Sequence, residues 1–248
     1  MMSIKNIIRN IGFFVLIFSL GACQEETLTE YQNDPRLSFG AKQDTLVVAS
    51  FFVIKTGIDL DTVFLQVETL GDTVGFDRPF SVEQIDTEAE YAAVPGIHYV
   101  GFDEPEIKAE LFIPAGAVKA AVPVIVKRDK SLQTAIYELR LKIQENEYFK
   151  PGLLNHTTCV VRISDKGDKP VMWDSFWRDS FGAWCSVKMK FIIDYVGLTD
   201  FEDYPSDASY GNYLKAKAQQ QLSAYKANPM NPPLYDETKL PEEIWISF

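Results

Sequence analysis

The sequence predicts a mainly β protein, in which an antiparallel β-sandwich is followed by a small α+β domain. Two observations support this prediction. Between residues 36 and 165, short runs of β-branched and aromatic residues are separated by Gly, Pro and Asp clusters, which is typical of antiparallel β structure. Beyond residue 170 the composition changes, because all four tryptophans lie there together with the best helical pattern of the chain.

Residues 1–22 predict a signal peptide. Lys5 and Arg9 give a positively charged start, and an apolar run extends from Ile11 to Leu20. A helix of that length covers about half of the ~30 Å hydrocarbon core of a membrane, since each residue adds ~1.5 Å. A permanent membrane span is therefore the poorer interpretation.

The apolar run ends in Leu20-Gly21-Ala22-Cys23, which has the pattern of a bacterial lipobox. Gly21 and Ala22 supply the small side chains that a signal peptidase accepts, and Cys23 supplies the thiol that receives a diacylglyceryl group. We therefore expect Cys23 to be the lipidated first residue of the mature chain, which its acyl chains then hold on a membrane.

Residues 23–35 predict an acidic, flexible tether, because they are polar and show no apolar period. Gln24-Glu25-Glu26 resembles the acidic signal that sends lipoproteins of Bacteroidota-type bacteria to the cell exterior. The alternative is a solvated linker that is acidic by chance. The expected location is the outer membrane, with the chain facing the cell exterior; the periplasmic leaflet remains the alternative.

The chain is acidic, with a formal net charge of −11 over 248 residues. This charge repels nucleic acid, so we expect no nucleic-acid partner. With Cys23 lipidated, Cys159 and Cys185 remain as thiols in an exported chain. They are either two buried reduced thiols, which the apolar surroundings favour, or a disulfide that joins the two halves.

The sandwich is expected at residues 36–165. Tyr137–Ile143 alternates strictly between apolar and polar residues, so one of its faces is buried and the other meets water. Pro114-Ala115-Gly116 predicts a tight turn, and Tyr91–Glu106 a long irregular loop. The seven predicted strands are Thr45–Ile54, Thr62–Leu70, Pro79–Ile85, Lys108–Ile113, Ala121–Lys127, Ala135–Ile143 and Thr157–Ser164.

Four segments of this region resemble the successive signature segments of a Calx-beta-type, immunoglobulin-like sandwich: Pro95–Tyr99, Leu111–Gly116, Val122–Asp129 and Tyr137–Leu141. The resemblance implies that fold. Calx-beta domains of ion exchangers bind calcium through acid-rich loops, but the acids here are scattered. Because a calcium site needs ~6 to 8 converging oxygens, we predict no metal site.

Asp165–Pro170 is a charged break that contains Gly and Pro, and it predicts the boundary to a second, aromatic-rich domain at residues 170–248. In this domain the alternation from Cys185 to Ile193 predicts a strand. An apolar stripe predicts one helix at about residues 209–227, with Ser206, Asp207 and Ser209 as candidate N-caps. Ile244–Phe248 can form a final strand.

Trp173, the approach Phe181–Trp184 and the Asn-Pro helix end before Pro232–Glu237 resemble an uncharacterised lipoprotein family of Bacteroidota. Members of that family are typically encoded beside SusC/SusD-type importers, in which a lipoprotein lid covers a TonB-dependent barrel. The resemblance implies a location and a partner, and it assigns no functional residues.

Patterns that indicate catalysis are scarce. His98 and His156, the two histidines, show no metal-ligand spacing and no nucleophile elbow accompanies them. The acids Asp200, Glu202, Asp203 and Asp207 could hold a glycosidase pair, but an acidic helix start explains Asp203 and Asp207 more simply. We therefore predict no catalytic residues and no cofactor.

The aromatic group offers a sharper hypothesis. Trp173, Phe176, Trp177 and Trp184 could present their faces to sugar rings or peptide side chains, and the three tryptophans are the candidate ligand or partner contacts. Their alternative role is to form the core of the second domain, which the size of these side chains favours.

The expected function is a surface-exposed outer-membrane lipoprotein that serves as a non-enzymatic accessory subunit of a SusC/SusD-type nutrient importer. One alternative is a free-standing lipoprotein that binds a glycan or peptide at the cell surface. A second alternative is a hydrolase that uses the acids between Asp200 and Asp207.

Overall fold

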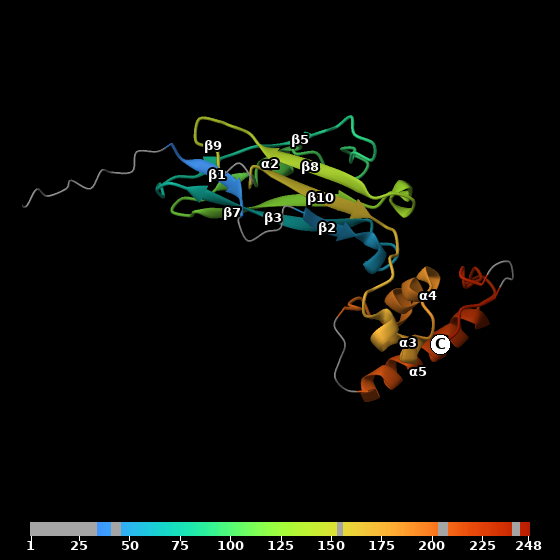
Figure 1. Ribbon diagram of the computed structural model, residues 1–248. Coiled ribbons are helices and arrows are strands. Elements are labelled where there is room, and N and C mark those ends of the chain that lie inside the picture. The colour runs from blue at the N-terminus through green and yellow to red at the C-terminus, as the bar shows by residue number, and fades with distance from the viewer. Residues whose placement is uncertain (1–33, 41–45, 153–155, 203–207, 240–243) are drawn as a thin grey trace, which may run out of the picture. The chain divides into compact units, whose positions relative to one another are not determined.

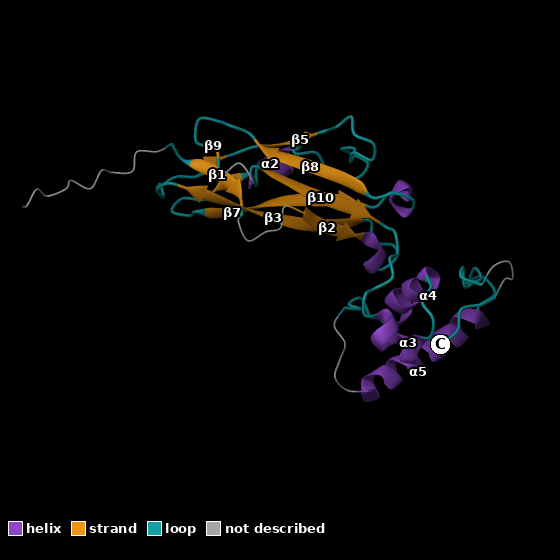
Figure 2. Cartoon of the chain, viewed as in Figure 1, coloured by secondary structure: helices purple, strands orange, loops and turns teal. Residues whose placement is uncertain are grey.

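A computed structural model describes residues 34–40, 46–152, 156–202, 208–239 and 244–248. The predicted signal peptide, Cys23 and most of the predicted tether lie outside these residues. Asp34–Phe248 forms one compact unit. Within its described part, the strands lie between Arg36 and Ser164 and the longer helices follow them in the chain (Figure 2). In this part of the chain, helices long and apolar enough to span a bilayer are not found.

The strands form two four-stranded sheets that pack as a sandwich (Figure 1). The strand order is β7-β3-β1-β9 in one sheet and β2-β10-β8-β5 in the other, and β4 pairs with β6 separately. The strands are β1 (Arg36–Phe39), β2 (Leu46–Ser50), β3 (Leu60–Leu70), β4 (Arg78–Pro79), β5 (Val82–Ile85), β6 (Phe112–Ile113), β7 (Lys119–Lys127), β8 (Tyr137–Ile143), β9 (Lys150–Pro151) and β10 (Thr158–Ser164).

The core of the sandwich lies between the two sheets. Alternate residues of each strand point inward, such as Leu65 of β3 and Val124 of β7 from one sheet, and Leu139 of β8 and Val161 of β10 from the other. Each of these four side chains is at most 1% exposed. Burying one such aliphatic side chain contributes roughly 1.5–3 kcal/mol, so the alternating pattern fixes which face of each strand is inside.

The predicted fold class is confirmed: a sandwich of mainly antiparallel strands precedes a small C-terminal unit. Each of the seven predicted strands overlaps an observed strand, and Gly116 in the predicted turn has a φ of +73°. The sequence pattern missed β1 and β9, which are short and pair in parallel with each other. It also missed that β2 runs parallel to β10.

The C-terminal unit is helical. Its helices are a wide π-type turn at Trp173–Trp177, α3 (Arg178–Phe181), α4 (Ser186–Phe191), a second π-type turn at Ile192–Val196, and α5 (Ala208–Ala227). Shorter helical turns occur in the sandwich at Phe51–Val53, α2 (Pro105–Lys108) and Lys130–Gln133.

The strand predicted at Cys185–Ile193 is wrong, because this segment forms α4 and the turn that follows it. Cys185, Met189, Ile192 and Val196 are all buried, and their spacing of three and four residues is that of one helix face. Ile192 already broke the apolar–polar alternation in the sequence. Gly197, with a φ of +85°, ends the helix in the left-handed conformation that glycine favours.

The predicted helix at residues 209–227 is confirmed by α5. Of its candidate N-caps, Ser206 and Asp207 lie outside the described residues, and Ser209 lies within the helix. The final strand predicted at Ile244–Phe248 is reduced to one isolated bridge between Tyr235 and Trp245.

The described residues form three apolar clusters. One fills the sandwich, and a second gathers around Trp177, Phe181 and Leu214 of the helical unit. A third, smaller cluster in the helical unit includes Cys185 and Leu222. Phe52, from the turn after β2, packs in the second core. Gly167 is required in the predicted boundary segment, because a Cβ atom there would collide with the Phe52 ring. The division into domains at residues 36–165 and 170–248 stays a prediction.

Arg78 of β4 is a buried cation that lies over an aromatic ring. Its side chain is 2% exposed, and none of its three guanidinium nitrogens has a hydrogen-bond partner within the described residues. The guanidinium carbon lies 4.7 Å from the centre of the Phe149 ring. Burial lowers the pKa of Arg78, since desolvation disfavours the charged form.

We predict that Arg78→Met raises the free energy of unfolding by about 1–3 kcal/mol, because Met keeps the apolar stem and removes a desolvated charge. Urea unfolding measures the change. Arg36→Met is the control, since the Arg36 guanidinium donates to the Pro151 carbonyl at 2.9 Å and its loss should destabilise the chain. A loss of about 2 kcal/mol or more in Arg78→Met would contradict the prediction.

Both described cysteines are free and buried, which confirms the interpretation as reduced thiols. Cys159 lies in the sandwich core and Cys185 in the core of the helical unit. Burial raises the pKa of the Cys159 thiol to about 11 and that of the Cys185 thiol to about 12.

Native mature protein should therefore react very slowly with a thiol reagent at pH 8, because only the thiolate attacks and both thiols are protonated and enclosed. In denaturant, the thiols of Cys159 and Cys185 should both react rapidly without added reductant. Ser175→Cys, at an exposed position, serves as a control that reacts in the native state. Fast native labelling of Cys159 or Cys185 would overturn the assignment.

Candidate functional site

Two of the three predicted contact residues are core residues. Trp173 and Trp177 are 0% exposed, so the prediction that they contact a ligand or partner is wrong for this structure. Their rings pack against Phe181 and Phe201, at centroid distances between 5.7 and 6.1 Å. The indole of Trp173 donates to the Gly182 carbonyl at 3.1 Å and that of Trp177 to the Phe201 carbonyl at 2.8 Å. The large indoles supply the apolar area that the small helical unit needs.

Trp184, the third predicted contact, is partly exposed and lines a cavity of about 840 Å³. We call this cavity the junction pocket, because its walls come from both the sandwich and the helical unit. Its lining residues are Phe52, Thr56, Gly57, Asp59, Arg128 and Gln133 from the sandwich, Asp165, Lys166 and Gly167 from the connecting segment, and Trp184, Ser186, Val187, Lys190, Phe191, Asp194, Tyr195, Tyr225, Leu234 and Glu237 from the helical unit.

The polar walls of the junction pocket are held by a network of contacts. Lys190 of α4 donates to the Ile54 carbonyl at 2.7 Å and pairs with Asp194 at 3.3 Å. Asp194 also accepts hydrogen bonds from the amide of Thr56 at 2.9 Å and from its hydroxyl at 2.7 Å. These bonds fix the side chains of the helical unit against the loop that follows β2.

The other side of the pocket is anchored by Arg128. Its Nε lies 3.3 Å from a carboxylate oxygen of Asp165, and a terminal nitrogen donates to the carbonyls of Phe51 and Ile54. Both side chains of the ion pair are largely buried, at 13% and 9% exposed. A pair so enclosed holds its position more firmly than a solvent-exposed one.

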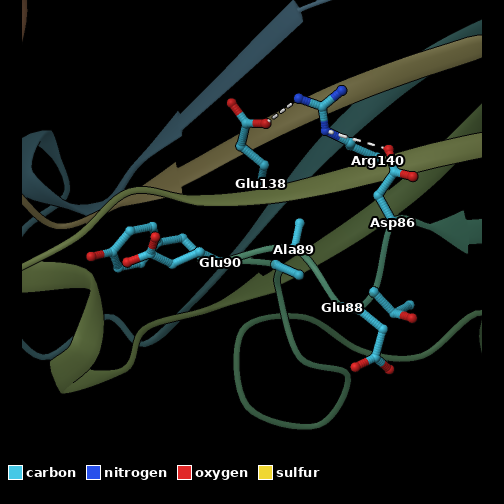
Figure 3. Close-up of a pocket in the computed structure, with 9 residues that line it drawn as sticks. Asp86, Glu88, Ala89, Glu90, Glu138 and Arg140 are labelled. Carbon is cyan, nitrogen blue, oxygen red and sulfur yellow. Dashed lines mark hydrogen bonds and ion pairs between the residues drawn. The ribbon is translucent and has the colours of Figure 1, made fainter.

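A second cavity, of about 610 Å³, lies beside the loop that follows β5 (Figure 3). Arg140 lies between two carboxylates there: it bonds Glu138 at 2.6 Å and pairs with Asp86 at 3.9 Å. Arg162 also pairs with Glu138, at 2.9 Å. Hydrogen bonds from Arg162 and Arg140 lower the pKa of the Glu138 carboxyl. The arrangement is a solvated ladder of charges on the outer face of the sheet, typical of a structural role.

The acids that suggested a hydrolase are only partly described, since Asp203 and Asp207 lie outside the described residues. Asp200 accepts the amide of Glu202 at 2.9 Å, and Glu202 accepts the amide of Val171 at 3.1 Å. Both described acids therefore cap backbone groups.

One group in the described part of the chain has the composition of a metal site: Cys185, Asp236 and Glu237 place ligand atoms within 4.8 Å of one another. Each of them has another role. Asp236 accepts from the amide and hydroxyl of Thr238 and pairs with Lys239, and Glu237 accepts the amide of Ser186. Cys185 is buried, and this burial raises the pKa of its thiol to about 12.

His98 holds the loop between β5 and β7. It is 3% exposed, accepts the Val94 amide on Nδ1 at 2.9 Å, and places Nε2 2.9 Å from the Ser131 hydroxyl. Since Nδ1 is the acceptor, Nε2 carries the proton and donates to Ser131, which in turn donates to Asp129 at 2.6 Å. In a nucleophilic triad the serine hydroxyl donates to the histidine, whereas here the histidine donates to the serine. This series of hydrogen bonds therefore has a structural role. His156 lies half-buried before β10.

The burial of His98 makes stability depend on pH. Desolvation lowers its pKa, against a smaller opposite effect of the Asp129 charge. Above about pH 6.5, the usual pKa of histidine, folded and unfolded chains both hold it neutral, so its contribution is complete. As pH falls below that value, His98 becomes protonated in the unfolded chain while it stays neutral in the folded chain, and this difference lowers the stability.

We therefore predict that unfolding free energy declines from about pH 6.5 downward through the lowered pKa, by about 1.4 kcal/mol for each unit by which that pKa is lowered. Urea titrations at several pH values measure this. His98→Gln, which keeps an acceptor and a donor, should lose that part of the slope. An unchanged slope in His98→Gln would contradict the assignment.

Sequence reasoning identified Trp184 as a site residue but missed Arg128, Lys190, Asp194 and Tyr195. They are spread over more than sixty positions of the chain, from residue 128 to residue 195, and only the fold brings them to one cavity. A short sequence motif cannot show that residues so far apart in the chain line the same cavity.

Comparison with solved structures finds distant similarity in Bacteroides proteins. EndoBT-3987 of Bacteroides thetaiotaomicron, solved with a Man5GlcNAc product, aligns with 12% identity and a TM-score of 0.37 over 52% of this chain and 30% of its own. A possible carbohydrate-binding protein of Bacteroides ovatus aligns with 18% identity and a TM-score of 0.34 over 53% and 37%. A Bacteroides ovatus protein of unknown function aligns with 23% identity and a TM-score of 0.37 over 51% and 43%.

The aligned parts span less than half of each of these three structures. Comparison with curated proteins gives no match. A family model described as a domain of unknown function, DUF4843, matches residues 23–198, which include the whole sandwich and the helical segments as far as Leu198. The chain therefore belongs to the DUF4843 family.

Proposed function

We propose that the protein is a lipid-anchored protein of the outer membrane, exposed on the cell surface, that acts as a non-enzymatic accessory subunit of a SusC/SusD-type nutrient importer. The observation that carries the proposal is the run Leu20–Cys23 with the acidic residues that follow it. The family match supports it, because the matched region begins at Cys23, where the mature chain is expected to begin.

The candidate catalytic side chains that the structure describes are engaged in structural hydrogen bonds, which supports a binding role. Within the described residues, His98 is used to hold a loop, and Asp200 and Glu202 bond backbone amides. By contrast, the junction pocket combines ring faces with fixed polar groups, which is the composition of a small-molecule site. This pocket also favours a second candidate function, a free-standing lipoprotein that binds a glycan or peptide.

Affinity purification from outer membranes in mild detergent separates the two candidates. An importer accessory should bring a TonB-dependent barrel and its lid lipoprotein with it in a fixed ratio. Cys23→Ala, which cannot be lipidated, should lose both the outer-membrane fraction and the barrel. A wild-type chain that is purified alone from intact outer membranes would contradict the importer role and leave the free-standing one.

A further inference from the structure

The lining of the junction pocket is rich in aromatic rings, and two of those rings are accessible. Tyr195 is 44% exposed, and Trp184 is partly exposed. Tyr195 stacks on Phe191 at a centroid distance of 4.7 Å and meets Tyr225 edge-on at 5.3 Å. Because these contacts hold the Tyr195 ring in place, a ligand that stacks on it loses little freedom to the protein side chain.

The charges around the pocket almost balance. Its ionisable lining consists of four acids and three bases: Asp59, Asp165, Asp194, Glu237, Arg128, Lys166 and Lys190. Arg128 is paired with Asp165, and Lys190 with Asp194. A phosphate or another strong anion would face these carboxylates without an unpaired buried cation to meet it, so the lining selects against such ligands.

Polar groups beside the rings still have capacity for hydrogen bonds. Gln133 and Lys166 line the pocket as exposed residues, and both can form hydrogen bonds with a ligand. The indole nitrogen of Trp184 is buried and has no partner among the described residues. A buried donor that bonds nothing costs roughly 1–3 kcal/mol, which a ligand hydroxyl that reaches it would recover.

We propose that the junction pocket binds a neutral carbohydrate through pyranose rings that stack on Tyr195 and Trp184. A pyranose has a face of C–H groups that suits an aromatic ring, and hydroxyls that both donate and accept hydrogen bonds. The four acids and three bases of the lining offer both kinds of partner, with one more acid than base. A purely aliphatic ligand would instead leave the polar lining desolvated and unpaired.

This inference deepens the proposed function, because it names the class of cargo that the surface protein binds. It rests on the proposed function only for the location at the cell surface, where the protein would encounter the carbohydrate. The two can fail separately. A chain that binds sugar but co-purifies with no barrel is a free-standing receptor, and a chain that co-purifies but binds no sugar is an accessory without this cargo.

The test is calorimetry on the mature lipoprotein in a detergent without a sugar head group. Maltotriose, cellotriose, mannotriose, xylotriose, galactose and N-acetylglucosamine are titrated at up to ~10 mM, a range that reaches affinities of about −3 to −4 kcal/mol. A panel of neutral tripeptides is titrated in parallel. We expect at least one saccharide to bind and the tripeptides to show no heat.

Three variants identify the site. Tyr195→Ala should weaken the saccharide by about tenfold, the equivalent of 1.4 kcal/mol. Trp184→Phe should remove the change in tryptophan fluorescence on binding, because Trp173 and Trp177 lie in the core and Trp245 does not line the pocket. Tyr210→Ala is the matched control: Tyr210 is 42% exposed but lies outside the pocket, so this variant should bind as wild type does.

The proposal is overturned if every saccharide fails to bind to wild type, or if only a tripeptide binds. It is also overturned if Tyr195→Ala, shown to be folded by circular dichroism, binds the saccharide as tightly as Tyr210→Ala, or if Trp184→Phe keeps the fluorescence change of the wild type.

Discussion

The bond network of Lys190 and Asp194 joins the helical unit to the sandwich, and the arrangement of the site depends on it. The ammonium of Lys190 is shared between the Ile54 carbonyl and the Asp194 carboxylate, and that carboxylate in turn holds the amide and hydroxyl of Thr56. Both charged side chains are less than a quarter exposed, so water competes weakly for these bonds. The network thus fixes polar side chains of the helical unit against the loop that follows β2, beside the rings that line the same cavity.

Burial by apolar rings complements this polar network. Phe52 leaves the sandwich to pack in the core around Trp177 and Phe181, and Gly167 leaves room for its ring. The aromatic side chains thus divide into two sets with different roles. Trp173 and Trp177 stabilise the helical unit from inside, whereas Trp184 and Tyr195 remain at its surface beside the pocket.

The sequence predicted those elements whose local pattern agrees with the surrounding fold. Tyr137–Ile143 alternates and is a strand with one buried face, and the apolar stripe near residues 209–227 is α5. At Cys185–Ile193 the local pattern was ambiguous, because a short apolar run of this kind can belong to a strand or to a buried helix. The segment forms a helix in the fold. Strands β1 and β9 are too short to show a period.

The candidate site could be predicted only in part, since one of its rings, Trp184, stands out by residue type while its polar residues do not. Arg128 and Asp165 look like any charged loop residues until the fold encloses them together. The expected location of the protein has the opposite character, because it is predicted from the local sequence Leu20–Cys23 alone.

Location on the cell surface is the claim on which the importer and cargo proposals both depend, and proteinase K treatment of intact cells tests it most directly. The account predicts that the chain is degraded while a periplasmic protein in the same cells survives, and that the Cys23→Ala variant is protected. Survival of the wild-type chain on intact cells, with degradation only after the outer membrane is opened, would contradict it.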